Sequence, residues 1–183
     1  TIADAIYEHE SGTKIIPSSL SIRELRQLNH NKLKEMSKKL KKMADFIILD
    51  SAAGLGEEAI AAIESADEII IITNPEIPAV TDALKTSKLA EQLGKEVKGV
   101  VVTRYNGNKY QMPLSNIRDM LELPIIGVIP EDKNVPKAVV MKDALIRTHP
   151  RSKASRAYRK LAARIIGKED YKDKASLWQM IFG

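Results

Sequence analysis

Short apolar runs rich in Ile and Val alternate along the chain with longer segments whose apolar residues recur at helical spacing. Continuous apolar runs of this length are typical of strands in the interior of a sheet. Because strands that alternate with helices form parallel sheets, we expect an α/β fold with a three-layer, doubly wound, mainly parallel sheet. The runs that predict strands are residues 13–16, 46–49, 68–73, 97–103 and 125–129.

The helices are predicted from their apolar spacing and from signals at their ends. Ser21 and Glu24 have the spacing of a capping box, which predicts a helix from residue 21 to about residue 43, interrupted at 29–31. Pro78 suits the first turn of a helix, and Gly94 suits a C-terminal cap. The other predicted helices are residues 57–66, 78–93, 114–121, 134–140, 152–166 and 172–182.

The composition fits one globular domain with an aliphatic core, since 44% of the 183 residues are apolar and 29% are charged. The absence of cysteine excludes disulfides, thiolate zinc sites and cysteine-ligated iron–sulfur clusters within these residues. No apolar run approaches the roughly 20 residues of a membrane-spanning helix, and residues 1–10 lack the features of a signal peptide. The cytoplasm is therefore the expected compartment.

Positive charge is concentrated in the C-terminal part of the chain. From Lys133 to the end, thirteen Lys and Arg residues accompany four acids. Such an excess suits the phosphates of lipids or of nucleic acid. A solvated helix surface explains it equally well, so charge alone does not choose between these alternatives.

The residues that follow the predicted strands are the candidates for chemistry, because doubly wound sheets bind ligands beyond the carboxyl ends of their strands. Asp50 ends an apolar run, where a carboxylate either holds Mg²⁺ through water or only caps the next turn. Gly54 and Gly56 in the following loop allow the backbone to lie close to a phosphate and to change conformation when the phosphate leaves.

This loop, Asp50-Ser51-Ala52-Ala53-Gly54, resembles the switch II segment of the MinD/ParA family of ATPases, with Ala52 where that family usually has Pro. The resemblance continues at the other strand ends, in the order found in the family. It implies the fold of P-loop NTPases for the sheet proposed above. The further matching segments are Ile15–Leu20, Asn74–Glu76, Thr81–Lys85, Gly99–Asn106 and Gly127–Asp132.

The resemblance implies that ATP and Mg²⁺ are the cofactors. It places a metal-organising carboxylate and a γ-phosphate sensor in the switch loop, and the remaining residues beside the nucleotide and its adenine. The nucleotide-binding residues that it implies are Gly54, Asn74, Arg104, Pro130 and Asp132, with Asp50 as the metal ligand.

Each of the base-side residues also has a purely structural explanation. Asn74 favours a turn that starts a helix, and the segment from Pro130 to Asp132 would serve as an ordinary turn after a strand. Thr103 departs from the family, which often has Asn at this place beside the Arg. Without that Asn, hydrogen bonding to the base is not expected here, and Arg104 is expected to stack on the base.

The phosphate-binding loop of such ATPases is absent from the sequence. No Gly-x-x-x-x-Gly-Lys-Ser/Thr motif occurs, and the Gly-Lys pairs at 94–95 and 167–168 follow predicted helices instead of preceding one. We expect a fragment that lacks the first strand and the P-loop of the intact ATPase, and a natural relative without catalysis is the alternative. In either case these 183 residues alone are not expected to hydrolyse ATP.

The C-terminal segment differs in character from the predicted switch domain, residues 1–168. Residues 169–183 are expected to form a linker and an amphipathic helix that resembles the membrane-targeting helix of the MinD family. A helix packed on the domain is the alternative. The apolar residues that would share one helix face and enter an anionic membrane are Leu177, Trp178, Ile181 and Phe182.

The leading functional hypothesis is a peripheral membrane Mg-ATPase of MinD type that positions cell-division or other cellular machinery. ATP would close a homodimer, and two weak membrane anchors would then act together. A ParA-type DNA-segregation ATPase and a non-catalytic regulatory relative are the alternatives, and the regulatory protein partner is not identified by the sequence. The iron–sulfur scaffold proteins of the same fold are excluded, because they need cysteines.

Overall fold

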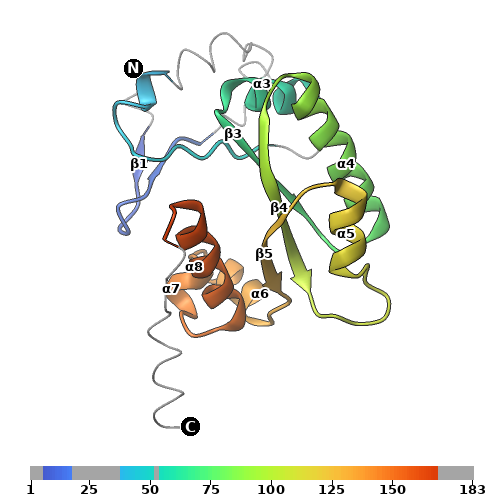
Figure 1. The fold of residues 1–183 in the computed structure, drawn as a ribbon. Coiled ribbons are helices and arrows are strands. Elements are labelled where there is room, and N and C mark those ends of the chain that lie inside the picture. The colour runs from blue at the N-terminus through green and yellow to red at the C-terminus, as the bar shows by residue number, and fades with distance from the viewer. Residues whose placement is uncertain (1–5, 18–37, 52–53, 169–183) are drawn as a thin grey trace. The chain divides into compact units, whose positions relative to one another are not determined.

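The computed structural model describes residues 6–17, 38–51 and 54–168. The chain divides into two compact units, residues 1–67 and residues 68–183. The second unit holds a three-stranded parallel sheet (Figure 1). Its strands are β3 (Glu68–Thr73), β4 (Glu96–Tyr105) and β5 (Ile125–Pro130), and they pair in the order β3-β4-β5.

Helices cover both faces of this sheet. On one face, α4 (Ile77–Gln92) and α5 (Leu114–Leu121) pack on β3 and β4 through a core of fully buried residues. On the other face, α8 (Lys153–Ile165) packs on β5 through a second core. The three layers and the parallel pairing confirm the predicted α/β architecture for this unit. The first core contains Ile71, Val80, Ala83, Val100, Val102, Ile117 and Leu121, and the second contains Val101, Ile129 and Ala154.

The ends of the long helices follow the predicted signals. Pro78 lies in the first turn of α4, where its missing N–H is not needed. Gly94 follows the helix with φ +68°, and its N–H donates to the Glu91 carbonyl at 2.9 Å. At the start of α8, the Ser152 hydroxyl accepts a hydrogen bond from the Ser155 N–H.

Two short helices lie between β5 and α8. They are α6 (Asn134–Val140), which was predicted, and α7 (Leu145–Thr148), which was not. The buried Ser155 hydroxyl joins α7 to α8, with its oxygen 2.7 Å from the His149 carbonyl and 3.2 Å from the Leu145 carbonyl. Ser155 and Leu145 are ten residues apart in the sequence. A local sequence pattern could therefore not reveal this contact.

The first unit corrects two predictions. The run 46–49 is not a strand, and Phe46 and Ile48 are 62% and 90% exposed. A strand needs backbone hydrogen bonds to a neighbour, and within the described residues none pairs with this run. The predicted strand 13–16 is shortened to β2 (Lys14–Ile15), which pairs antiparallel with β1 (Tyr7–Glu8) in a hairpin instead of joining a parallel sheet.

The helix predicted at 57–66 is present as α3 (Glu57–Ser65). The helix predicted from residue 21 falls largely outside the described residues, which show helix only at 38–40 in that stretch. The predicted C-terminal helix, with Leu177, Trp178, Ile181 and Phe182, also lies outside them. Among the helices that are described, none combines the length and apolar character needed to cross a bilayer.

Candidate functional site

The carboxyl ends of β3, β4 and β5 meet at one edge of the parallel sheet (Figure 1). Asn74 follows β3, and the Thr103 hydroxyl on β4 donates to its Oδ1 at 2.7 Å. Thr103 is only partly buried, whereas Thr73 at the end of β3 is 5% exposed. The hydrogen bond from β4 therefore holds the Asn74 side chain at this edge of the sheet, whether or not Asn74 also starts a turn.

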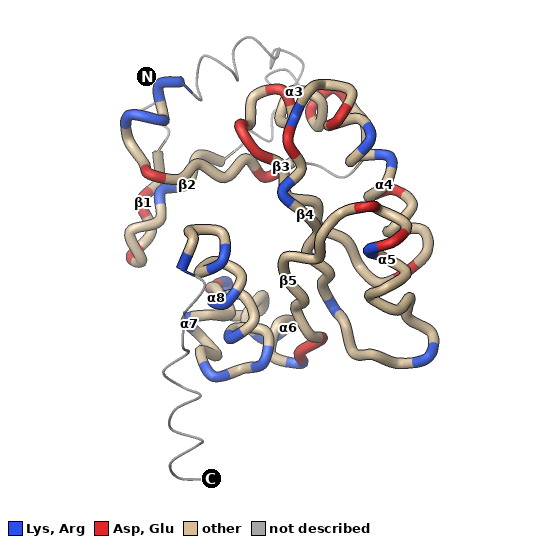
Figure 2. Tube along the Cα trace, in the orientation of Figure 1, with Lys and Arg blue, Asp and Glu red and all other residues tan. Residues whose placement is uncertain are grey.

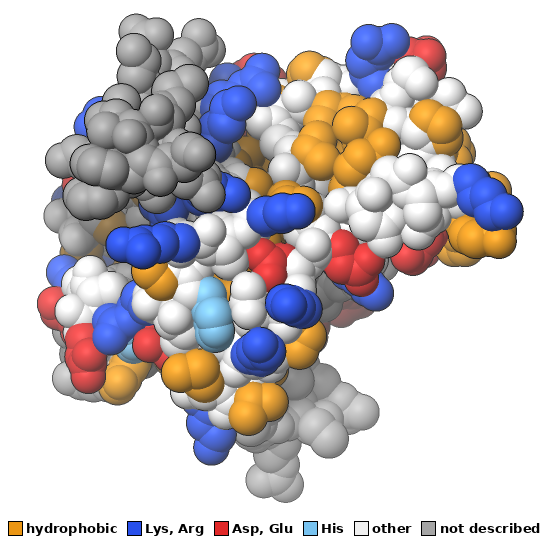
Figure 3. Space-filling model, turned by 90° about the horizontal axis from the view of Figure 1, so that it is seen from below, with side chains coloured by type: hydrophobic (Ala, Val, Ile, Leu, Met, Phe, Trp, Pro, Cys, Tyr) orange, Lys and Arg blue, Asp and Glu red, His pale blue; other side chains and the backbone are white. Residues whose placement is uncertain are grey.

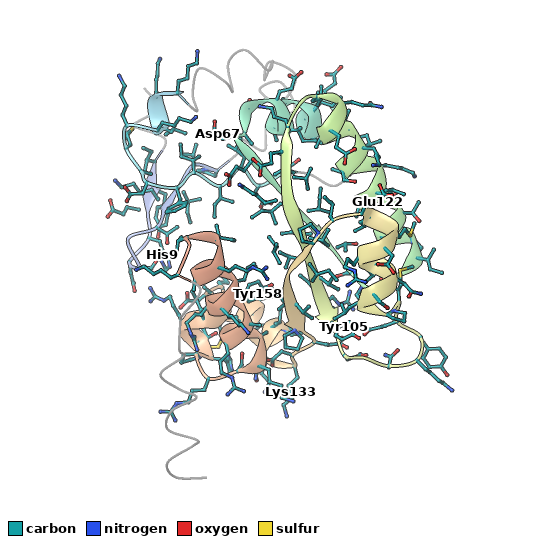
Figure 4. The ribbon with its side chains drawn as sticks, in the orientation of Figure 1. His9, Asp67, Tyr105, Glu122, Lys133 and Tyr158 are labelled. Carbon is teal, nitrogen blue, oxygen red and sulfur yellow. The ribbon has the colours of Figure 1, made fainter. Side chains whose placement is uncertain are left out.

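The exits of β4 and β5 are joined by two hydrogen bonds. The Glu131 N–H donates to the Tyr105 carbonyl at 3.0 Å, and the Asn106 amide donates to the Glu131 carboxylate at 2.7 Å. Tyr105 pairs with Pro130 in the sheet register, and Figure 4 labels it at the end of β4. The two segments that the sequence assigns to the base side thus form one continuous wall.

The loop after β4 is organised by Gln111. Its side-chain oxygen accepts hydrogen bonds from the N–H groups of Asn106 and Gly107, at 2.9 and 3.1 Å. Its side-chain amide donates to the Arg104 carbonyl at 2.9 Å. A further bond from the Met112 N–H to the Pro75 carbonyl, at 2.8 Å, ties the end of the loop to the exit of β3.

Arg104 has an unusual backbone conformation at this edge, with φ +56°. A side chain in this left-handed region costs about 1–2 kcal/mol, and such strain concentrates at functional sites. Its guanidinium makes no hydrogen bond or ion pair within the described residues. It lines a cavity of about 260 Å³ together with Glu76, Asn106, Asn108, Tyr110, Gln111 and Glu131.

Asp132 has a structural task that the sequence did not indicate. Its two carboxylate oxygens accept hydrogen bonds from the Asn134 N–H at 2.9 Å and from the Ala154 N–H at 3.1 Å. The bond from Asn134, followed by that from Ala154, lowers the pKa of the Asp132 carboxyl below its ordinary value, against an opposing effect of burial. Asp132 therefore fastens the starts of α6 and α8 to the end of β5, and it does not line the cavity.

The predicted metal and phosphate residues belong to the other compact unit. Asp50 is exposed, and Gly54 has φ +99°, a conformation that favours glycine. Within the ranges that the structure describes, no group of three or more His, Asp or Glu side chains is arranged to hold a metal ion. The meeting of Asp50 with the three other strand ends stays a prediction.

Sequence reasoning did not single out three residues that build this edge. Asn106, Gln111 and Glu131 make the network, although none was named as a site residue. The run of Asn106, Gly107 and Asn108 directly after a strand was an available signal, because these residues favour turns that bond to side chains. The role of Gln111 had no local signal, since its partners lie four to seven residues away in an irregular loop.

Comparison with known proteins connects this geometry to a family. Residues 9–145 match the model of the CobQ/CobB/MinD/ParA nucleotide binding domain. An uncharacterised ATP-binding protein of Methanocaldococcus jannaschii is 37% identical over 166 residues, which are 91% of this chain and 63% of that protein. The present chain therefore spans about 63% of the length of this relative.

Solved structures show the same likeness. The septum site-determining protein MinD of Pyrococcus horikoshii, complexed with Mg-ADP, superposes with a TM-score of 0.83 at 31% identity, covering 90% of this chain and 68% of that one. The MinC:MinD complex of Aquifex aeolicus gives a TM-score of 0.79 at 23% identity, covering 94% of this chain and 71% of that one. The second likeness shows the fold alone.

Proposed function

The chain belongs to the CobQ/CobB/MinD/ParA nucleotide-binding family, and we propose that it forms the base-binding side of an ATP-dependent switch of MinD type. One observation carries this proposal. The exits of β3, β4 and β5 are joined by hydrogen bonds into a single polar edge, at the place where sheets of this kind bind ligands.

The cavity at this edge suits the adenine ring. A planar guanidinium stacks on aromatic rings, and Arg104 has no partner in the described residues that would hold it elsewhere. The amides and carboxylates around it, including Asn108 and Glu131, offer donors and acceptors for the ring edge. Asn74 and Pro130 would border the same nucleotide from the neighbouring strands.

The phosphates and Mg²⁺ would be bound by other residues. Asp50 would supply one carboxylate to the metal, with phosphate oxygens and water as its further ligands, and Gly54 would respond to the γ-phosphate. The proposal requires a phosphate-binding loop, which the 183 residues do not contain.

The cellular role that fits this switch is the positioning of division or other machinery at an anionic membrane. In the intact protein, ATP would close a homodimer whose two C-terminal helices bind the membrane together. Leu177, Trp178, Ile181 and Phe182 would enter the lipid interface. Because a relative of the same fold forms a complex with MinC, a regulatory protein partner is also part of the proposal.

The base side can be tested on the chain itself by amide NMR titration with adenosine and with ATP. Since the phosphate loop is absent from the sequence, both ligands should bind at about millimolar concentration and shift the same resonances, at residues 104–111 and 131–132. Arg104→Gly should abolish the shifts without unfolding the chain, because glycine tolerates its backbone conformation. Arg118→Ala, an exposed cation on α5, is the charge-matched control. Shifts confined to other parts of the chain would rule out the assignment.

The basic C-terminal half favours one alternative, a ParA-type DNA-segregation ATPase. Residues 133–168 contain eleven Lys and Arg and one acid, a balance that suits the phosphates of DNA. Measuring vesicle flotation and DNA retention on the same chain distinguishes the membrane function from the DNA function. Retention of duplex DNA with a steep salt dependence, and no flotation, would replace the membrane role with the DNA role.

A further inference from the structure

An exposed apolar segment ends α6 and continues toward α7. Val139, Val140 and Met141 are consecutive and are 70%, 82% and 60% exposed, and Ile146 on α7 is also exposed. Lys142 follows directly and is exposed as well. We call these five residues the α6–α7 tip. Consecutive exposed aliphatic side chains are a feature of contact surfaces more than of ordinary solvated helices.

The tip lies in the most basic part of the structure. Figure 2 shows Lys and Arg along α6, α7 and α8, and the single acid of residues 133–168, Asp143, is paired with Arg147 at 3.2 Å. In the space-filling view of Figure 3, which is seen from below, basic and apolar side chains are interspersed, with acidic side chains among them. The side chains here that make no ion pair or hydrogen bond in the described structure are Lys133, Lys137, Lys142, Arg151, Lys153, Lys160 and Lys168.

Lys142 is held at the tip in a strained conformation. Its φ is +53°, and the N–H groups of Lys142 and Asp143 donate to the carbonyls of Val139 and Ala138, a pattern that usually places glycine at this position. Glycine would relieve the strain. The turn that ends α6 thus carries a cation at the end of the exposed apolar segment, at a position where glycine would also make the turn.

We propose that the α6–α7 tip is a contact surface for an anionic lipid bilayer. The inference rests on the membrane association proposed above, and it adds a second contact on the folded domain. Cations without partners, next to exposed aliphatic side chains, match the headgroups and the apolar boundary of such a bilayer together. DNA would use the cations but leaves Val140 and Met141 in water.

The two contacts are able to reach one membrane. The three linker residues 169–171 span at most about 10 Å, and the helix expected at 172–182 would add about 16 Å, whereas α8, with its thirteen residues, is about 20 Å long. The start of α8 is fastened to α6 through Asp132. A segment that leaves the far end of α8 is thus long enough to return to the start of α8, where Asp132 holds α6.

The test is co-flotation of the full chain with vesicles of phosphatidylglycerol and phosphatidylcholine in equal parts, at low salt. A tail variant, with serine at Leu177, Trp178, Ile181 and Phe182, isolates the contribution of the folded domain. In that background Lys142→Gly should weaken binding about fivefold, as expected for one cation at an anionic surface. Val140→Gln should weaken it about tenfold through the loss of apolar burial. Neither change should lower the urea midpoint, and Lys142→Gly should raise it.

Glu122→Gly is the matched control. Glu122 is, among the described residues, the other non-glycine residue with positive φ at a helix end, φ +54° after α5, and it lies away from α6 (Figure 4). This variant should also raise the urea midpoint but should not weaken vesicle binding.

Three results would overturn the proposal. If Lys142→Gly raises the midpoint and binds vesicles as tightly as its parent, the tip makes no contact. If the tail variant does not float while the parent chain does, the membrane role stands without the tip. If duplex DNA binds the tail variant more tightly than vesicles do, with the same losses in both variants, the surface is for nucleic acid.

Discussion

Asp132 offers the sharpest test of how the structure fastens α6 and α8 to the end of β5. Its carboxylate accepts the N–H groups of Asn134 and Ala154, at 2.9 and 3.1 Å, and so binds two helices to the end of β5. Asp132→Ala removes both acceptors and leaves two backbone donors in a partly buried place. Asp132→Asn keeps one acceptor oxygen but loses the charge.

The expected cost follows from these two bonds. Capping residues replaced by alanine cost about 0.5–2 kcal/mol, and a hydrogen bond to a charged group contributes about 1.5–3 kcal/mol net of the competing water. Water can reach the N–H of the partly buried Asn134 after the change, whereas the N–H of the fully buried Ala154 loses its acceptor, so we expect Asp132→Ala to lower the free energy of unfolding by about 2 kcal/mol. Asp132→Asn should cost roughly half as much.

The assay is urea unfolding at a series of pH values, with Asp82→Asn as control, since Asp82 is an exposed carboxylate that pairs, among the described residues, with Lys85 alone. The pKa of Asp132 is lower in the folded chain than in the unfolded one. Its contribution is therefore fully present above the unfolded pKa, about 3.9, and is lost as the pH falls through the folded pKa. The difference between the parent and Asp132→Asn should be constant from pH 7 to about pH 5 and shrink in more acid solution.

Two results would refute this reasoning. A loss below about 0.5 kcal/mol for Asp132→Ala would mean that the two hydrogen bonds contribute no more than a surface residue does. A difference that grows as the solution becomes more acid would mean that the folded pKa is raised, contrary to the hydrogen bonds on the carboxylate.

Three further changes probe the packing around the site. Gly99→Ala should cost more than about 2 kcal/mol in urea unfolding, because its φ is +146° and a Cβ would collide with the Pro124 carbonyl oxygen. Ser155→Ala should cost about 1–3 kcal/mol, since the His149 carbonyl would lose its buried donor, and a cost near zero would show that water replaces the hydroxyl. Ile117→Ala should cost about 2–5 kcal/mol in the same assay, because Ile117 is fully buried between α5 and the sheet.

The sequence predicted the second unit well because its elements depend on local patterns. Apolar runs at 68–73, 97–103 and 125–129 all form strands, and capping residues such as Gly94 end their helices where expected. The run 46–49 has the same apolar character, yet it forms no strand. An apolar run shows that a segment is able to join a sheet, whereas the partner that completes the strand is a property of the rest of the chain.

The sequence predicted at which edge of the sheet the candidate site lies, but not the hydrogen bonds that form it. The rule that ligands bind at strand ends led to Asn74, Arg104 and Pro130, and the structure brings these three strand ends to one edge. The network that fixes the edge was missed, since the bond from Asn106 to Glu131 joins residues 25 positions apart. Such a bond leaves no periodic trace in the sequence.

Within the part of the chain that the structure describes, three residues other than glycine have positive φ, and comparing them shows which strain serves folding and which does not. Glu122 and Lys142 each follow a helix, where the chain must turn to end it and the left-handed conformation has a structural cause. Arg104 follows no helix and lies at the end of β4, beside the cavity. The turn at Arg104 lets its backbone carbonyl accept a hydrogen bond from the Gln111 side-chain amide. Glycine at position 104 would make the same turn with less strain. The turn at the end of β4 therefore does not require an arginine side chain. The position of this side chain in the lining of the cavity points instead to ligand binding.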